Sequence, residues 1–135
     1  MNELSQLDLV YYDPPYNQHP YGSNYHMLNT ILKYVEPKEI SDVAGIPVDW
    51  KKSLYNKQKH ALSTFTELIN KTDSKYIMIS YNNEGFIKYD EMLEMCEKKG
   101  DVRVFDCVYN TFRGSRNLKK RDIKVTEYIF LIKTF

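Results

Sequence analysis

Apolar residues along this chain recur in two spacings, one typical of strands and the other typical of helices. Short apolar or alternating runs bounded by turn-forming residues predict strands, whereas apolar residues three and four positions apart predict helices. The predicted strands cover residues 7–12, 75–80, 101–110 and 126–133. The predicted helices cover about 24–35, 56–71 and 89–100.

The ends of these elements carry signals of their own. Ser23 or Asn24 can cap the first helix, and Gly100 suits the C-terminal cap of the last one. Residues 36–53 contain two prolines and a glycine and are expected to form a long loop. The apolar face of the first helix is expected to hold Tyr25, Leu28, Ile31 and Leu32.

Strands alternate with helices along most of the chain, which predicts an α/β fold with a layered sheet. No helix is predicted between the last two strands, so we expect them to pair antiparallel and the sheet to be mixed. The sequence shows no repeat, no low-complexity tract and no sign of a second domain. Residues 1–135 are therefore expected to form a single domain.

The composition is that of a globular protein. Of the 135 residues, 42% are hydrophobic and 27% are charged, and the formal net charge is +1, which is ordinary for a soluble domain. No apolar run reaches membrane-spanning length and the N-terminus lacks a secretory signal, so a cytoplasmic location without membrane association is expected. Cys96 and Cys107 lack a CxxC spacing and are expected to be buried thiols in a reducing compartment.

The first predicted strand ends in the segment "DPPYN", residues 13–17. In open α/β sheets, ligands bind beyond the carboxyl ends of the strands. The Asp13 carboxylate and the Pro14 carbonyl are two acceptors, and Tyr16 offers a flat apolar face. Together they suit a planar ring that bears an amino group; the alternative is a proline turn with a solvated acid and a core tyrosine.

The wider sequence resembles the adenine-N6 DNA methyltransferases. "DPPYN" is followed by "YGSNYHMLNTI", and "SYNNEG" (80–85) follows the second predicted strand. The resemblance is closest to the group in which the methyl-donor motif precedes the catalytic motif. Asp13 to Tyr16 match the catalytic motif, Tyr76 to Gly85 the next strand and loop, and Val125 to Lys133 the closing strand. The resemblance implies a Rossmann-like fold that uses S-adenosylmethionine.

The implied reaction transfers a methyl group from S-adenosylmethionine to the N6 amine of an adenine flipped out of double-stranded DNA, as in restriction-modification systems. Asp13 and the Pro14 carbonyl would bind the amine, Pro15 would keep the loop rigid, and Tyr16 would stack on the base. Asp13 would also lie near the methyl group of the donor.

Four further residues are candidates for the same cleft. Tyr109 and Phe112 could stack on the other face of the base, and Tyr81 and Asn82 could line the cleft after the second predicted strand. For each, a core or loop role is the alternative.

Two basic segments are candidates for contacts with DNA phosphates, which give affinity without sequence information. The alternative is a solvated surface. The histidines show no metal-binding spacing, so no metal site is expected. The expected phosphate contacts are Lys51, Lys52, Arg113, Arg116, Lys119, Lys120 and Arg121.

The family holds its donor with a glycine-rich loop, which this sequence lacks. We therefore expect the chain to be the C-terminal catalytic half of an enzyme, to bind S-adenosylmethionine weakly alone, and to associate with a missing N-terminal half, a partner subunit or itself. Two alternatives remain open: a methyltransferase that acts on an RNA base, and an inactive DNA-binding remnant or subunit.

Overall fold

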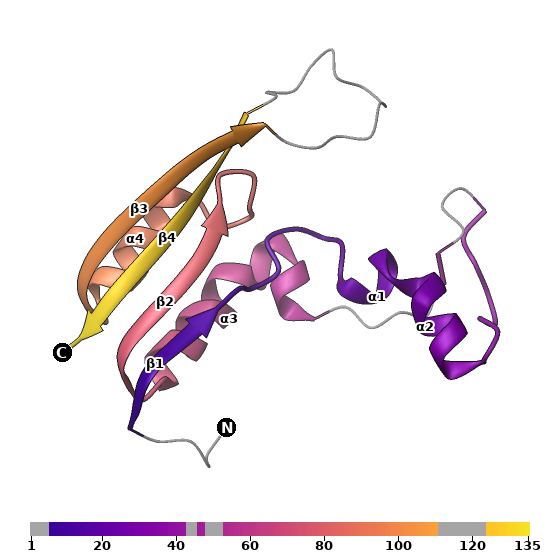
Figure 1. The fold of residues 1–135 in the computed structure, drawn as a ribbon, viewed down its shortest axis with the longest axis horizontal. Helices are drawn as coiled ribbons and strands as arrows, with labels where there is room; N and C mark the ends of the chain where they lie inside the picture. Colours follow the sequence, from indigo (N-terminus) through magenta and orange to yellow (C-terminus); the bar gives the residue numbers. More distant parts are fainter. Residues whose placement is uncertain (1–5, 43–45, 48–52, 111–123) are drawn as a thin grey trace.

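The computed structural model of the protein describes residues 6–42, 46–47, 53–110 and 124–135. They form a mixed sheet with the strand order β1-β2-β4-β3 (Figure 1). The strands are β1 (Leu7–Tyr12), β2 (Ser74–Asn82), β3 (Gly100–Asn110) and β4 (Lys124–Thr134). The helices are α1 (Tyr21–Asn24), α2 (His26–Lys33), the 3-10 turn η1 (Leu54–Asn56), α3 (Gln58–Lys71) and α4 (Tyr89–Glu97).

The pairing of the strands confirms the predicted mixed α/β sheet. β1 runs parallel to β2, with Leu9 opposite Tyr76. β4 lies antiparallel between β2 and β3, so the two final strands pair as expected. All four predicted strands are present, and β1 begins and ends where the apolar run predicted.

Helices α3 and α4 both cover one face of the sheet (Figure 1), and the core lies between them and the strands. Phe65 of α3 and Met92 of α4 are fully buried against Ile79 of β2 and Phe130 of β4. Burial of such large side chains contributes roughly 1.5–3 kcal/mol each. This layer holds the strand ends in place.

The opposite face of the sheet carries large apolar side chains that remain exposed. Because strand side chains alternate, Leu9 and Tyr11 of β1 point away from α3, and they are 50% and 53% exposed. Tyr76 and Phe105 lie on the same face and are 40% and 56% exposed. Within the described residues, no helix packs against this face, and no strand pairs with the outer edge of β1.

The single helix predicted over residues 24–35 is wrong, since the structure has two shorter helices, α1 and α2, with Tyr25 between them. Tyr25 is the residue before α2 and makes no side-chain cap bond. Ser23 is not a cap; it lies buried inside α1, where its hydroxyl donates to the Pro20 carbonyl. The expected apolar face of α2 is exposed, with Leu32 at 83%.

Gly100 does not cap α4, which ends at Glu97 and is followed by Lys98 in the right-handed conformation. Gly100 instead begins β3 opposite Thr134. A Cβ atom at this position would lie 2.1 Å from the Lys133 carbonyl oxygen. Glycine is therefore required here by the close approach of β4.

The two cysteines differ, and the expectation of two buried thiols is wrong for Cys107, which is exposed. Cys96 lies on the buried face of α4, and burial raises the pKa of its thiol to about 12. No helix of the described residues has the length and apolar character needed to cross a bilayer.

Candidate active site

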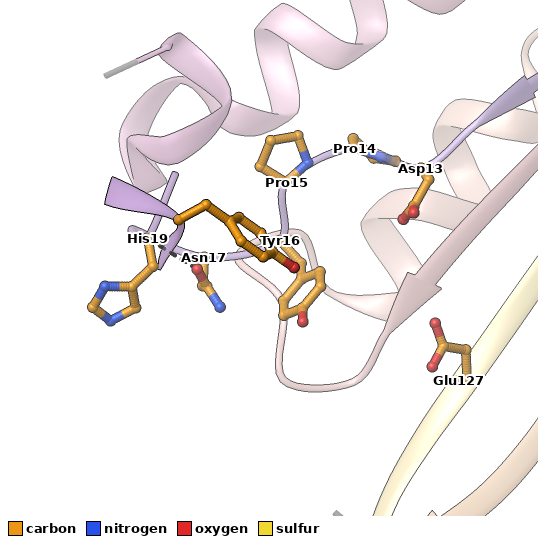
Figure 2. A pocket seen from close by; sticks show the side chains of 8 residues that line it. Asp13, Pro14, Pro15, Tyr16, Asn17, His19 and Glu127 are labelled. Carbon is orange, nitrogen blue, oxygen red and sulfur yellow. Dashed lines mark hydrogen bonds between the residues drawn. The ribbon is translucent and has the colours of Figure 1, made fainter. Parts of the chain in front are cut away.

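Residues 13–17 follow β1 directly and form one wall of a pocket of about 350 Å³ at the carboxyl end of that strand (Figure 2). Proline lacks a backbone donor and fixes its own φ angle, so Pro14 and Pro15 end the strand and keep the segment extended. The pocket is lined by Asp13, Pro14, Pro15, Tyr16, Asn17, His19, Tyr25 and Glu127.

The loop that carries Asp13 to Tyr16 is held by hydrogen bonds from two other parts of the chain. The Phe86 backbone N–H donates to the Tyr16 carbonyl at 3.0 Å. The Asn56 side-chain amide donates to the Asn17 carbonyl at 2.9 Å, and Asn56 is only 5% exposed. The side-chain oxygen of Asn56 accepts a hydrogen bond from the Ser53 hydroxyl at 2.9 Å. Asn56 therefore joins η1 to the loop, and both the nitrogen and the oxygen of its side-chain amide are hydrogen-bonded.

The pocket places two carboxylates opposite one another. Figure 2 shows the side chains of Asp13 and Glu127 on facing sides of the same space, the first from the loop and the second from β4. Tyr16 extends beside them and is 41% exposed. Acceptors next to an aromatic face suit a planar ligand that carries hydrogen-bond donors.

Glu127 was not among the residues predicted from the sequence. It lies opposite Asn82 and Cys107 in the sheet. Its side chain accepts a hydrogen bond from the Tyr109 hydroxyl at 2.8 Å and one from the Ser80 hydroxyl at 3.2 Å. One signal in the sequence could have indicated it. Side chains two positions apart in a strand lie on the same face, and Glu127 is an acid on a face of the predicted strand that also carries Ile129 and Leu131.

Tyr109 lies near the end of β3 and is 43% exposed. It does not itself line the pocket, but its hydroxyl donates a hydrogen bond to Glu127, which does. That hydrogen bond is the main cause that raises the pKa of Tyr109; partial burial and the charges of Glu127, Tyr16 and Glu84 raise it further. The influence of Tyr16 agrees with a position close to the loop.

Tyr81 and Asn82 were expected to line the pocket, but neither of them does. Tyr81 is 4% exposed in the core beneath the sheet, where its hydroxyl accepts a hydrogen bond from the Ile87 backbone N–H at 3.2 Å and burial raises its pKa. Asn82 is 7% exposed and accepts from the Glu84 backbone N–H at 3.1 Å. Both residues build the turn after β2, and the Phe86 backbone N–H that follows this turn donates to the loop of residues 13–17.

The remaining predicted residues lie outside the described part of the chain, and their roles stay predictions. They are Phe112, Lys51, Lys52, Arg113, Arg116, Lys119, Lys120 and Arg121.

Comparison with known proteins agrees with the geometry of the loop. Residues 2–95 match the family model described as D12 class N6 adenine-specific DNA methyltransferase. The chain is 33% identical to the type II methyltransferase M.FokI of Planomicrobium okeanokoites over 93% of this chain and 20% of that protein. It is 32% identical to the type II methyltransferase M.NlaIII of Neisseria lactamica over 95% of this chain and 39% of that protein.

The modification methylase StsI of Streptococcus sanguinis is 34% identical over 97% of this chain and 21% of its own length. The chain thus spans between about a fifth and two fifths of the length of these relatives. No solved structure matches the chain significantly. The family match covers the loop after β1, Asn56 and Phe86, which hold that loop, and most of α4. It confirms the resemblance seen in the sequence. This chain belongs to the D12 class of N6 adenine-specific DNA methyltransferases.

Proposed function

We propose that this chain receives and activates the target adenine in the transfer of a methyl group from S-adenosylmethionine to the N6 amine of adenine in DNA. The observation that carries the proposal is the loop of residues 13–16. Its carboxylate, proline carbonyl and tyrosine border one pocket, and two hydrogen bonds from distant segments hold it.

The chemistry follows from the weak nucleophilicity of the adenine amine, whose lone pair is delocalised into the ring. Hydrogen bonds from the two N–H groups to the Asp13 carboxylate and the Pro14 carbonyl favour a pyramidal nitrogen. They also stabilise the positive charge that develops on it. The nitrogen would form its bond to the methyl carbon as the carbon–sulfur bond breaks. The electron pair of that bond would stay on the sulfur, which leaves as a neutral thioether, and the surplus N–H proton would pass to water.

Access to the pocket requires the adenine to leave the base stack. A pocket of about 350 Å³ that opens beside an exposed tyrosine can receive a flat base. Stacking of the base on Tyr16 contributes roughly 1–3 kcal/mol and offsets part of the cost of unstacking.

S-adenosylmethionine supplies a methyl group on a positively charged sulfur. The facing carboxylates of Asp13 and Glu127 fit the cationic end of such a donor, and Asp13 is the residue that we propose to lie beside the methyl group. This pocket provides few further contacts, so we propose that the chain binds the donor weakly by itself.

We further propose that the rest of the donor site comes from a second polypeptide segment, which can be the N-terminal part of the enzyme, a partner subunit or another copy of the chain. The support is the open edge of β1 and the exposed apolar face beside it, where Leu9 and Tyr11 are about half exposed. An unpaired strand edge is a template for another strand. The proposal also includes double-stranded DNA as the substrate, held by the basic residues predicted above, and a cytoplasmic location.

The test adds methyl-labelled S-adenosylmethionine and either DNA or RNA to the chain. One preparation contains the chain alone, and a second contains M.NlaIII in which the matching segment has been replaced by this chain. The proposal predicts N6-methyladenine in DNA, with more product in the second preparation. Label on RNA alone, label on another atom, or no labelled DNA in either preparation would contradict it.

A further inference from the structure

Glu127 lines the pocket but takes no part in the proposed bond formation. It projects from β4 on the side opposite Asp13 (Figure 2). One carboxylate oxygen accepts from the Tyr109 hydroxyl at 2.8 Å and the other accepts from the Ser80 hydroxyl at 3.2 Å. Tyr109 belongs to β3 and Ser80 to β2, so Glu127 links the strands on both sides of β4.

We propose that Glu127 is a positioning residue that holds the ring of Tyr109 beside the adenine pocket, where the ring can stack on the bound base. This inference rests on the proposed function and names the residue that shapes the same site.

The location of Tyr109 explains why it needs a partner. It lies at the end of β3, which is an outer strand of the sheet, and it is 43% exposed. An exposed side chain on an edge strand has several rotamers open to it, and ordering it on ligand binding costs affinity. The bond to Glu127 selects one orientation before the base arrives. Ser80, which is 8% exposed, fixes the other carboxylate oxygen and therefore fixes Glu127 itself.

The hydrogen bond between Tyr109 and Glu127 is of a kind that can hold the tyrosine ring in one orientation. A hydroxyl that donates to a carboxylate forms a stronger hydrogen bond than one that donates to a neutral acceptor. The raised pKa of Tyr109, whose largest cause is this bond, keeps the phenol protonated and able to donate. Tyr16 also raises that pKa through its charge, which agrees with two hydroxyls near one another.

The alternative is that the bond only strengthens the hairpin of β3 and β4. Tyr109 and Glu127 are diagonal neighbours in that hairpin, and such pairs stabilise sheets. A purely structural role would change the free energy of unfolding but would leave base binding by the folded protein unchanged. Base binding therefore separates the two roles.

The first measurement follows the ionisation of Tyr109 in the chain labelled with ¹³C at the tyrosine ring, with Tyr109→Phe used to assign its signal. In Glu127→Gln, the ionised fraction at pH 10 should rise towards one half, because the charged acceptor is lost. Glu84→Gln is the matched control. It removes a charge that also raises the pKa of Tyr109 but is the last of its causes, so the change should be clearly smaller. An unchanged titration in Glu127→Gln would show that Glu127 does not hold Tyr109.

The second measurement is the Kd of the chain for an end-labelled single-stranded DNA that contains one adenine among thymines, followed by fluorescence anisotropy. Glu127→Ala and Tyr109→Phe should each raise Kd by about two- to tenfold, the equivalent of the roughly 0.5–1.5 kcal/mol that ordering the free ring costs on binding. Glu127→Gln, which retains an acceptor oxygen, should bind more tightly than Glu127→Ala. Urea unfolding of each variant accounts for any unfolded fraction, and if Glu127→Ala does not fold, Tyr109→Phe and Glu127→Gln carry the test.

The outcomes are distinct. Wild-type Kd in both Glu127→Ala and Tyr109→Phe would overturn the inference and leave the proposed function intact. No binding of the adenine-containing strand by the wild-type chain would instead contradict the adenine pocket itself, whatever the titration of Tyr109 shows.

Discussion

Replacement of Asn56 by alanine should release the loop of residues 13–17 without unfolding the protein. The Asn56 amide is 5% exposed, donates to the Asn17 carbonyl at 2.9 Å and accepts from Ser53. Loss of a buried hydrogen bond that leaves its partner unsatisfied costs about 1–3 kcal/mol. The loop is also held by the bond from the Phe86 N–H to the Tyr16 carbonyl, so the exchange rate of the Phe86 amide reports whether the loop is docked.

Amide hydrogen exchange measured by NMR provides the assay. A loss of about 1–3 kcal/mol should accelerate exchange of the Phe86 amide by about five- to 150-fold. The amide of Asn83 donates to the Thr126 carbonyl at 3.0 Å and not to the loop, so its exchange rate should change much less. Asn70→Ala, on the exposed side of α3, is the control variant and should leave both amides unchanged. Equal acceleration at Phe86 and Asn83 would mean that Asn56 supports the whole fold, and no acceleration at Phe86 would mean that it does not hold the loop.

Two further predictions concern residues that do not line the pocket. Ellman's reagent at pH 8 should label one thiol per folded chain, because Cys107 is exposed whereas Cys96 is buried with a pKa of about 12 and stays protonated; rapid labelling of two thiols would contradict the burial of Cys96. Gly100→Ala should lower the free energy of unfolding in urea by about 1–3 kcal/mol, because its methyl group would lie 2.1 Å from the Lys133 carbonyl oxygen. Unchanged stability would show that β3 can move away from β4 at little cost.

The parts of the structure that depend on neighbouring residues were predictable from the sequence. The apolar run of residues 7–12 and the prolines that follow it define β1 and the position of Asp13 at its carboxyl end, because both effects act within a few residues. The antiparallel pairing of β3 and β4 was expected because the sequence pattern predicts no helix between them. The string around Asp13 then pointed to the family.

The parts that depend on contacts between distant segments were not predictable. Glu127 joins the site because β4 inserts between β2 and β3, and the sequence does not give this strand order. Asn56 holds the loop from 39 positions along the chain. Tyr81 follows a strand and looked like a cleft residue, but its side chain points to the helical face of the sheet. Gly100 looked like a helix cap, and the approach of Lys133 was not visible in its neighbours.

The most direct test of the central claim compares methyl transfer to DNA by Asp13→Ala and Asp8→Ala in the preparation that contains the rest of M.NlaIII. Asp8 belongs to the same segment, but it is exposed and forms a surface ion pair with Lys75 at 2.6 Å, which is worth little. If Asp13 binds the adenine amine, Asp13→Ala should lower the rate of transfer by about 100-fold or more while DNA binding stays near wild type, and Asp8→Ala should keep both. Near-normal transfer by Asp13→Ala would contradict the claim that this loop activates the target amine.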